Sequence, residues 1–244
     1  MVNHSTVLIE QAGRTILTDP IWSGRASPVA SMGPKRHRAP GIAFADLPKI
    51  DLVLISHNHY DHFDTRTLRR IAANHSPAII VPLGLGGLVR TLGFARIEEL
   101  DWWEEALSIR SVPARHFSAR GLFDRNRTLW CGYAFETLAG IVYFAGDTAS
   151  GSHFEQIRNR FGRPRIALLP IGAYEPRWFM RAVHMSPCEA LEAHRVLGAR
   201  ESIAIHHGTF QLSDEHIDRP RSDLARCGSG EAFRALRNGE TIRF

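Results

Sequence analysis

The chain has 244 residues, of which 44% are hydrophobic and 23% charged, and its formal net charge is +5. These values are ordinary for a globular protein and fit one domain over residues 1–244. No apolar run approaches the roughly 20 residues of a membrane helix, and the first residues lack the basic and apolar regions of a signal peptide. We therefore expect a cytoplasmic domain, at most peripheral to the inner membrane surface.

The positive charge comes almost entirely from arginine, because Lys35 and Lys49 are the two lysines of the sequence. Arginine binds phosphate and carboxylate groups in a bidentate manner, so an anionic substrate is compatible with this composition. A bias toward arginine codons is the simpler explanation. The arginines form no basic arm and accompany no nucleic-acid motif, so we expect no nucleic-acid partner.

The three cysteines, Cys131, Cys188 and Cys227, are scattered along the chain and form no C-x-x-C pair. Their spacing predicts neither a thiolate metal site nor a disulfide framework. We interpret all three as structural.

The first half of the chain alternates short apolar runs with turn residues. Gln11-Ala12-Gly13 separates two such runs and predicts a β-hairpin. A loop rich in glycine, proline and arginine follows, from about Pro20 to Pro40. By apolar pattern and length, we expect strands over 6–9, 15–17, 51–55 and 78–81, and a helix over 67–73.

In the second half, apolar runs repeatedly end in polar residues. Ser186-Pro187-Cys188-Glu189 is a capping box with proline at the first helical position. Polar side chains at strand ends, with helices in the connections, indicate an α/β architecture with its active site along one sheet edge. The predicted elements are strands over 107–112, 140–144, 166–169 and 202–205, and helices over 154–160 and 187–197.

A dense cluster of potential metal ligands follows the predicted strand 51–55. Its members, all within the segment Ser56–His62, are His57, His59, Asp61 and His62. Imidazole and carboxylate groups suit zinc and other borderline metals. A solvated histidine-rich loop is the alternative, but it does not explain three imidazoles and a carboxylate within one turn after a buried strand.

The pattern H-x-H-x-D-H is the signature of the metallo-β-lactamase superfamily, which this chain resembles. The resemblance implies an α/β fold, the αββα sandwich in which two mixed β-sheets are flanked by helices. It also implies three further ligands, each just past a predicted strand: His116, Asp147 and His206.

The same resemblance implies two divalent metal ions, most simply Zn²⁺, with iron or manganese as alternatives. Three imidazoles hold the first ion: His57, His59 and His116. The second ion has one carboxylate and two imidazole ligands: Asp61, His62 and His206. Asp147 bridges the ions together with a water or hydroxide, and so belongs to the catalytic machinery.

Longer segments resemble N-acyl-phosphatidylethanolamine phospholipase D and its bacterial relatives, over nearly the whole chain to about Pro220. The segments are Thr18–Trp22, Gly33–Arg36, Ser56–His62, Leu100–Glu104, Arg120–Asn126, Leu129–Gly132 and Leu169–Met180. This resemblance implies cleavage of a phosphodiester, in a small molecule or a phospholipid, by a metal-bridging hydroxide. Contact with a membrane surface and a homodimer are compatible with it. A lactonase or other carboxylic-ester hydrolase on the same metal pair is the alternative.

The sequence departs from this family in two places. The family carries further residues, including a first strand, before the segment that begins here at Asn3-His4, so we expect that strand to be missing or truncated. The residue after the last ligand is commonly tryptophan but is His207 here. His207 is thus an alternative ligand, although alternation along a strand admits only one of the two and alignment with the family favours His206.

Two further residues are candidates for supporting roles. Asp19 follows a strand and either orients a metal ligand through a hydrogen bond or is an ordinary turn residue. In the resemblance, His184 lies near the substrate as a catalytic residue that steadies phosphate charge or protonates the leaving oxygen. A structural histidine at a helix entry is its alternative.

Several aromatic and basic residues have no assigned role in catalysis. Four aromatic residues either line an acyl-chain groove or, as we favour, belong to the core: Trp102, Trp103, Trp178 and Phe179. Arg177 and Arg181 either contact phosphate or, as we favour, lie on the surface. Six histidines show no ligand spacing and receive no function: His4, His37, His75, His153, His194 and His216.

Overall fold

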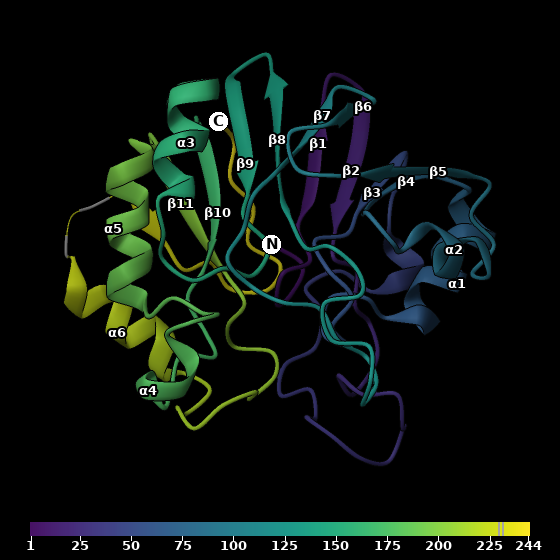
Figure 1. The fold of residues 1–244 in the computed structure, drawn as a ribbon, viewed down its shortest axis with the longest axis horizontal. Helices are drawn as coiled ribbons and strands as arrows, with labels where there is room; N and C mark the ends of the chain where they lie inside the picture. Colours follow the sequence, from purple (N-terminus) through teal and green to yellow (C-terminus); the bar gives the residue numbers. More distant parts are fainter. Residues whose placement is uncertain (229, 231) are drawn as a thin grey trace.

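The computed structural model describes residues 1–228, 230 and 232–244, and in it two β-sheets face each other between two layers of helices (Figure 1). The first sheet has the order β1-β2-β3-β4-β5, with β1 antiparallel to β2 and the other pairs parallel. Its strands are β1 (Leu8–Gln11), β2 (Arg14–Thr18), β3 (Leu52–Leu54), β4 (Ala78–Pro82) and β5 (Arg96–Leu100). The predicted hairpin is therefore confirmed.

The second sheet has the order β12-β11-β10-β9-β8-β7-β6. Strands β9 to β12 are parallel, whereas β6 to β9 are antiparallel neighbours. Its strands are β6 (Glu105–Ala106), β7 (Ile109–Val112), β8 (Gly132–Thr137), β9 (Gly140–Phe144), β10 (Ile166–Pro170), β11 (Glu201–Ile205) and β12 (Phe233–Arg234). Both sheets are thus mixed, and the αββα sandwich is confirmed.

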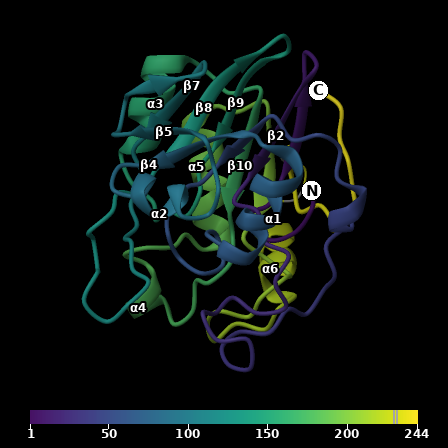
Figure 2. The ribbon, with the colours of Figure 1, turned by 90° about the vertical axis from the view of Figure 1, so that its right-hand side faces the viewer.

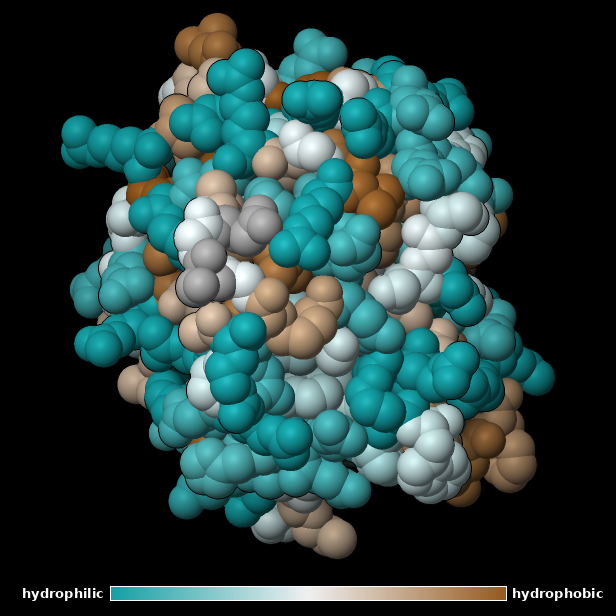
Figure 3. All heavy atoms as spheres, turned by 90° about the vertical axis from the view of Figure 1, so that its left-hand side faces the viewer, coloured by the Kyte–Doolittle hydropathy of each residue, from teal (hydrophilic) through white to brown (hydrophobic). Residues whose placement is uncertain are grey.

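Helices cover the outer face of each sheet. Helices α1 (Thr65–His75) and α2 (Gly86–Arg90) lie on the first sheet (Figure 2). The second sheet is covered by α3 (His153–Phe161), α5 (Pro187–Leu197) and α6 (Arg219–Cys227), whose outer surface is mostly hydrophilic (Figure 3). The short elements are α4 (Arg177–Met180) and the 3₁₀ helix η1 (Phe44–Asp46). None of the helices in the described part of the chain has the length and apolar character of a membrane-spanning segment.

Three layers of buried side chains hold these elements together. Leu54 and Leu168 point between the two sheets, whereas Val53 packs beneath α1 and Ala167 beneath the helices of the second sheet. Central strands buried on both faces are apolar at successive positions, which explains the continuous apolar runs of the sequence. Truncation of one such residue, for example Leu54→Ala, costs about 2–5 kcal/mol.

Local signals determine how well each helix boundary was predicted. Helix α5 spans the predicted residues 187–197, because Ser186 and Glu189 form the capping box and Gly198 ends the helix in a left-handed conformation. Helix α1 extends two residues beyond each end of the predicted 67–73. Seven helices and strands were not predicted: β5, β6, β8, β12, α2, α4 and α6.

The expectation that the cysteines form no disulfide was wrong for one pair. Cys188, at the start of α5, and Cys227, at the end of α6, form a disulfide, with Cα atoms 5.3 Å apart. The two residues are 39 positions apart in sequence, and the packing of α5 against α6 brings them together. Cys131 is a free thiol that is buried in the core between the sheets, and burial raises its pKa to about 12.

Candidate metal centre

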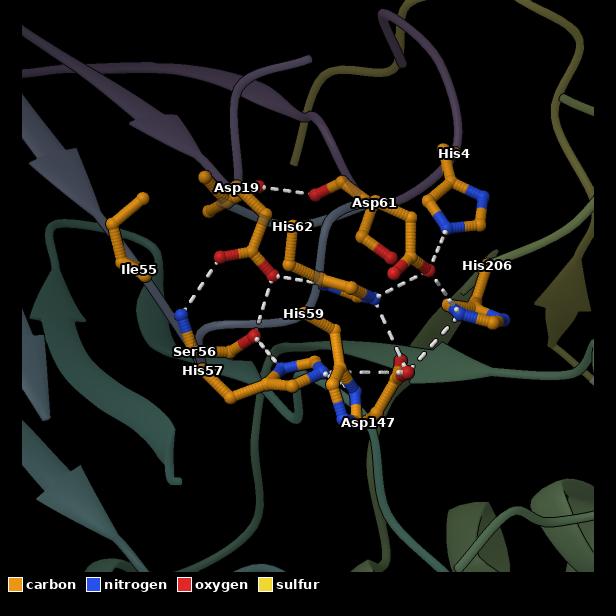
Figure 4. Close-up of polar contacts among 12 residues, drawn as sticks. His4, Asp19, Ile55, Ser56, His57, His59, Asp61, His62, Asp147 and His206 are labelled. Atoms are coloured by element: carbon orange, nitrogen blue, oxygen red, sulfur yellow. Dashed lines mark hydrogen bonds and ion pairs between the residues drawn. The ribbon is translucent and has the colours of Figure 1, made fainter. Parts of the chain in front are cut away.

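All seven predicted metal ligands meet at one end of the sandwich, where strands of both sheets end. The segment from His57 to His62 follows β3 of the first sheet. The others follow strands of the second sheet: His116 after β7, Asp147 after β9 and His206 after β11. The expectation of a site along one sheet edge was therefore wrong. Because the sheets face each other, their strand ends converge on one site (Figure 4).

The first donor group consists of His57, His59 and His116. The His59 Nδ1 atom lies 2.8 Å from His57 Nε2 and 3.1 Å from His116 Nε2. The outer ring nitrogens are held by oxygen atoms: His57 Nδ1 lies 2.9 Å from Ser56 Oγ, and His116 Nδ1 donates to Val183 O at 2.9 Å. Such outer partners fix the ring orientation and leave the inner nitrogens free to bind a cation.

The second donor group consists of the predicted ligands Asp61, His62 and His206 together with His4. The Asp61 Oδ2 atom lies 3.2 Å from Nε2 of both His62 and His206. His62 Nδ1 donates to Asp19 Oδ2 at 2.6 Å. His207 belongs to none of the donor groups in the described part of the chain, so His206 occupies the predicted ligand position.

The Asp147 carboxylate lies between the two donor groups. Its Oδ2 atom is 3.0 Å from His206 Nε2 and 3.1 Å from His62 Nε2. The same oxygen is 3.9 Å from Nε2 of His57 and of His116. One carboxylate oxygen thus reaches imidazoles of both groups.

The close approach of Asp147 to the other ligands depends on Gly146. This glycine has a left-handed φ of 60°, and a Cβ atom there would lie 2.5 Å from Ser56 Cβ. A larger residue would therefore push the end of β9 away from the H-x-H-x-D-H segment.

The charges of the centre are strongly coupled. Burial alone would raise the pKa of Asp147, but His206 and His62 hold it well below its usual value. Burial would lower the pKa of His206, but Asp147 and hydrogen bonds to both carboxylates raise it to about 9. Burial and the neighbouring His62 lower the pKa of His57 well below its usual value.

The donor set fits divalent cations. In the first group, ring nitrogens of the three histidines lie at hydrogen-bonding distance from one another. The lone pairs of neutral rings at this distance repel one another unless a proton or a cation lies between them. Asp147 Oδ1 has no hydrogen-bond partner among the described residues, despite its burial. Nitrogen and carboxylate donors without a thiolate suit zinc, iron or manganese.

Asp19 orients both donor groups. Its carboxylate is fully buried and accepts hydrogen bonds from the Ser56 backbone N–H at 2.7 Å and the Ser56 hydroxyl at 2.6 Å. It also accepts the His62 Nδ1 proton, and the Ser56 hydroxyl in turn contacts His57. The predicted orienting hydrogen bond is confirmed.

His184 lies beside the centre. Its Nδ1 atom is buried, without a hydrogen-bond partner among the described residues, and 4.0 Å from Asp147 Oδ2. Its ring centroid lies 5.0 Å from that of His116. Burial lowers the pKa of His184 to about 4. The predicted proximity to the centre is thus present, and its catalytic role stays a prediction.

The four aromatic residues fall into two pairs. Trp102 packs against the core between the sheets and donates to Trp130 O, and Trp103 stacks on Phe161. In contrast, Trp178 and Phe179 of α4 are 80% and 63% exposed, so the expectation that they belong to the core was wrong. Helix α4 has a single turn and no buried residue, so it cannot bury them.

The two arginines near α4 do not reach the donor groups. Arg177 pairs with Glu189 at 2.6 Å and donates to the carbonyl oxygens of Tyr174 and His184. Arg181 is exposed. Arg177 therefore fastens the segment that carries His184, a role that sequence reasoning missed.

Two further residues of the centre were also missed. His4 is fully buried, and its Nε2 atom lies 3.0 Å from Asp61 Oδ2. Arg120 donates to the carbonyl oxygens of Asn58 and Phe63 and lies 3.9 Å over the Tyr60 ring. Both residues are about 60 positions from their contacts, so no spacing pattern reveals them. A run of polar residues at the start of the chain, before an apolar strand, is the signal that could have drawn attention to His4.

The fold and the donor set define a metal-dependent hydrolase of the αββα class. A family model described as the β-lactamase superfamily domain matches residues 14–207, and the chain belongs to this superfamily. It is 40% identical over 240 residues to N-acyl-phosphatidylethanolamine-hydrolyzing phospholipase D 1 of Caenorhabditis elegans, covering 91% of this chain and 67% of that protein.

Other relatives agree with this placement. The mitochondrial N-acyl-phosphatidylethanolamine-hydrolyzing phospholipase D of Saccharomyces cerevisiae is 36% identical over 233 residues, which are 91% of this chain and 50% of that protein. The chain thus spans between half and about two thirds of the length of these two relatives. The crystal structure of an isothiocyanate hydrolase from Delia radicum gut bacteria has the same fold, with a TM-score of 0.78, 20% identity and coverage of 100% of this chain and 97% of that one.

Proposed function

We propose that this protein is a phosphodiesterase that uses two divalent metal ions, most simply zinc, and acts on a phospholipid of the N-acyl-phosphatidylethanolamine type. The observation that carries the proposal is the position of Asp147, whose Oδ2 lies 3.0–3.9 Å from imidazoles of both donor groups. A carboxylate shared in this way is what a pair of cations needs. The similarity to phospholipase D enzymes supports the choice of substrate.

Each donor group would hold one ion. The first ion would bind His57, His59 and His116, the second Asp61, His62 and His206, and Asp147 would bind both. Such a pair supplies a nucleophile from water near neutral pH and offsets the negative charge on phosphate oxygens. The chain contributes the orientation of the ligands through Asp19 and Ser56, and it buries six of the seven ligands, His59 being partly exposed.

His184 would bind the substrate as a neutral hydrogen-bond donor and would not carry a positive charge at pH 7. Because burial lowers its pKa to about 4, the ring is neutral at pH 7 and carries one N–H donor. Its Nδ1 atom has no hydrogen-bond partner among the described residues and lies 4.0 Å from Asp147 Oδ2. A proton on Nδ1 would bind the leaving oxygen or a phosphate oxygen, and the hydrogen bond from Arg177 to the His184 carbonyl would steady the backbone that carries the ring.

Exposed apolar residues beside the centre support contact with a membrane surface. Phe123 lies in the loop that Arg120 anchors to the metal-ligand segment, and Trp178 and Phe179 adjoin the segment that carries His184. Aromatic side chains of this kind favour the membrane–water interface. We expect the double variant Trp178→Ala/Phe179→Ala to float less with phosphatidylethanolamine vesicles than the wild type. Leu138→Ala, at the opposite end of β9, is the control. Equal flotation of all three proteins would contradict the membrane contact.

The decisive experiment measures bound zinc and hydrolysis of three substrates by the purified protein. The substrates are N-acyl-phosphatidylethanolamine vesicles, bis-p-nitrophenyl phosphate and a simple lactone. In Asp147→Ala, we expect both ions to be lost and kcat/KM for the phosphodiesters to fall by at least about 100-fold. Asp218→Asn, an exposed carboxylate paired with Arg38, is the matched control.

Other outcomes would overturn parts of the proposal. Turnover of the lactone alone, with two bound ions, would retain the centre and replace the phosphodiesterase by a carboxylic-ester hydrolase. No zinc after reconstitution would contradict the metal centre itself.

A further inference from the structure

The chain begins with a turn of buried polar residues that is fastened to the metal centre. Asn3, His4, Ser5 and Thr6 are all fully buried. The backbone N–H of Thr6 donates to Asn3 O at 2.6 Å and closes the turn. Burying four polar residues is unfavourable unless they are hydrogen-bonded. The hydrogen-bond partners of this turn therefore indicate its role.

Side-chain hydrogen bonds join the turn to the loop after β2. The Thr6 hydroxyl donates to Asp19 O at 2.7 Å, and the Asn3 amide donates to Ile21 O at 3.2 Å. The Arg36 guanidinium donates to the Asn3 side-chain oxygen at 3.1 Å. The turn is therefore part of the same framework as Asp19, which orients the ligands.

The backbone of His4 is fixed from two sides. Its N–H donates to the Thr209 hydroxyl at 2.9 Å, and its carbonyl accepts the N–H of His206 at 2.9 Å. Its φ of 44° is left-handed, a conformation that is unfavourable for residues other than glycine and that surrounding contacts must maintain. These contacts direct the ring toward Asp61, with His4 Nε2 3.0 Å from Asp61 Oδ2 (Figure 4).

Three imidazole nitrogens of the described residues contact Asp61 Oδ2, and they differ in what they can do when a cation is present. Nε2 of His62 and of His206 would each point a lone pair at the cation and carry no proton. His62 also cannot turn its other nitrogen inward, because Nδ1 is bound to Asp19. His4 is then the imidazole that can still donate a proton to this carboxylate.

We propose that His4 is a positioning residue whose Nε2–H donates to Asp61 Oδ2 and holds this carboxylate in place for the second cation. The inference rests on the proposed function only in that a cation occupies the Asp61, His62 and His206 group. Outer hydrogen bonds to a metal ligand typically change metal affinity by about 10- to 100-fold. His4 should therefore affect the second donor group and leave the first group unchanged.

The test is a zinc titration of the metal-free protein against a chromophoric chelator, which gives the number of sites and the Kd of each. His4→Gln retains an N–H donor near the position of Nε2, His4→Asn withdraws the donor by one methylene, and His4→Phe keeps the ring without a donor. His194→Phe is the matched control. Like His4, His194 is buried and hydrogen-bonded, in this case to the Ser202 hydroxyl, but it lies in α5.

We expect one of the two zinc sites to weaken by about 10- to 100-fold in His4→Asn and His4→Phe. The other site should stay unchanged, as should both sites in His194→Phe. His4→Gln should bind both ions within about threefold of the wild type if its donor restores the bond. Two unchanged sites in His4→Asn would overturn the proposal. An equal loss in His4→Gln would overturn it too, because the N–H donor would then not account for the effect of His4.

Two further results separate this inference from the proposed function. A wild-type protein that binds a single ion would overturn the dinuclear proposal, whereas weaker binding of that ion in His4→Asn, restored in His4→Gln, would still support the role of His4. Thermal unfolding of each metal-free variant shows whether it is folded. If His4→Phe is unfolded, the pair His4→Gln and His4→Asn, which differ by one methylene, carries the test.

Discussion

The two donor groups of the metal centre differ in the charge that surrounds them. The first group has three imidazoles, and neutral oxygens of Ser56 and Val183 hold two of them from outside. The second group includes the Asp61 carboxylate, and a second carboxylate, that of Asp19, holds His62 from outside. The second group thus carries more negative charge. Protons would neutralise this charge in the metal-free protein, and a cation would neutralise it in the metal-bound protein. The contrast predicts that the two donor groups respond differently to protons and to metal ions.

The sharpest contrast should appear in the pH response of the metal-free protein. The pKa of His206, in the second group, is about 9, because Asp147 and hydrogen bonds to both carboxylates outweigh burial. The pKa of His184, beside the first group, is about 4 because of burial. His206 therefore stabilises the fold fully below its unfolded pKa of about 6.5, and this contribution is lost as the pH rises through 9. His184 has the opposite sign: stability is lost as the pH falls from about 6.5 through 4.

Imidazole NMR titration and urea unfolding between pH 4 and pH 10 would check this prediction. His206→Gln should remove the loss of stability on the alkaline side and leave the acidic side in place. A common midpoint near 6.5 for both histidines would show that the two sides of the centre do not differ.

Asp19→Asn should have the next largest effect, because Asp19 touches both groups. It binds His62 directly and reaches His57 through Ser56. An amide keeps the shape but removes the charge that holds the His62 Nδ1 proton, so we expect zinc affinity to fall by about 100-fold at the second group and about 10-fold at the first. Chelator competition measures both values. Asp51→Asn, on the surface, is the control, and equal losses at the two groups would contradict the charge difference.

Ser56→Ala should have the smallest effect. It removes the hydroxyl that contacts His57 Nδ1 but retains the backbone N–H that donates to Asp19. We expect a loss of zinc affinity of up to about 10-fold at the first group and little change at the second. A larger change at the second group would mean that the Ser56 hydroxyl acts mainly through Asp19.

The convergence of the seven predicted metal ligands could be anticipated because their signals are local or belong to a family pattern. Four of them lie within six residues, and each of the others follows an apolar strand. Helix α5 could be predicted from its capping box for the same reason. Strand β5 and helix α6 were missed, since three of the five residues of β5 and four of the nine residues of α6 are charged.

Features that depend on tertiary packing could not be predicted from spacing. The contact of His4 with Asp61 spans 57 positions, and the Cys188–Cys227 bond spans 39. The exposure of Trp178 and Phe179 also follows from the short length of α4 rather than from residue type. In each case the outcome depends on which distant segment packs against the residue. The composition of the residue's own segment does not reveal that partner.

The disulfide between α5 and α6 also closes residues 188–227 into a covalent ring that contains His206. A protease that cuts once within this ring, for example in the exposed stretch around Gln211 or Asp214, leaves two fragments that remain bonded to each other. Such a nicked protein would migrate as one chain in electrophoresis without thiol and as two chains with it. His206 would thus stay attached to the rest of the molecule after a single backbone break.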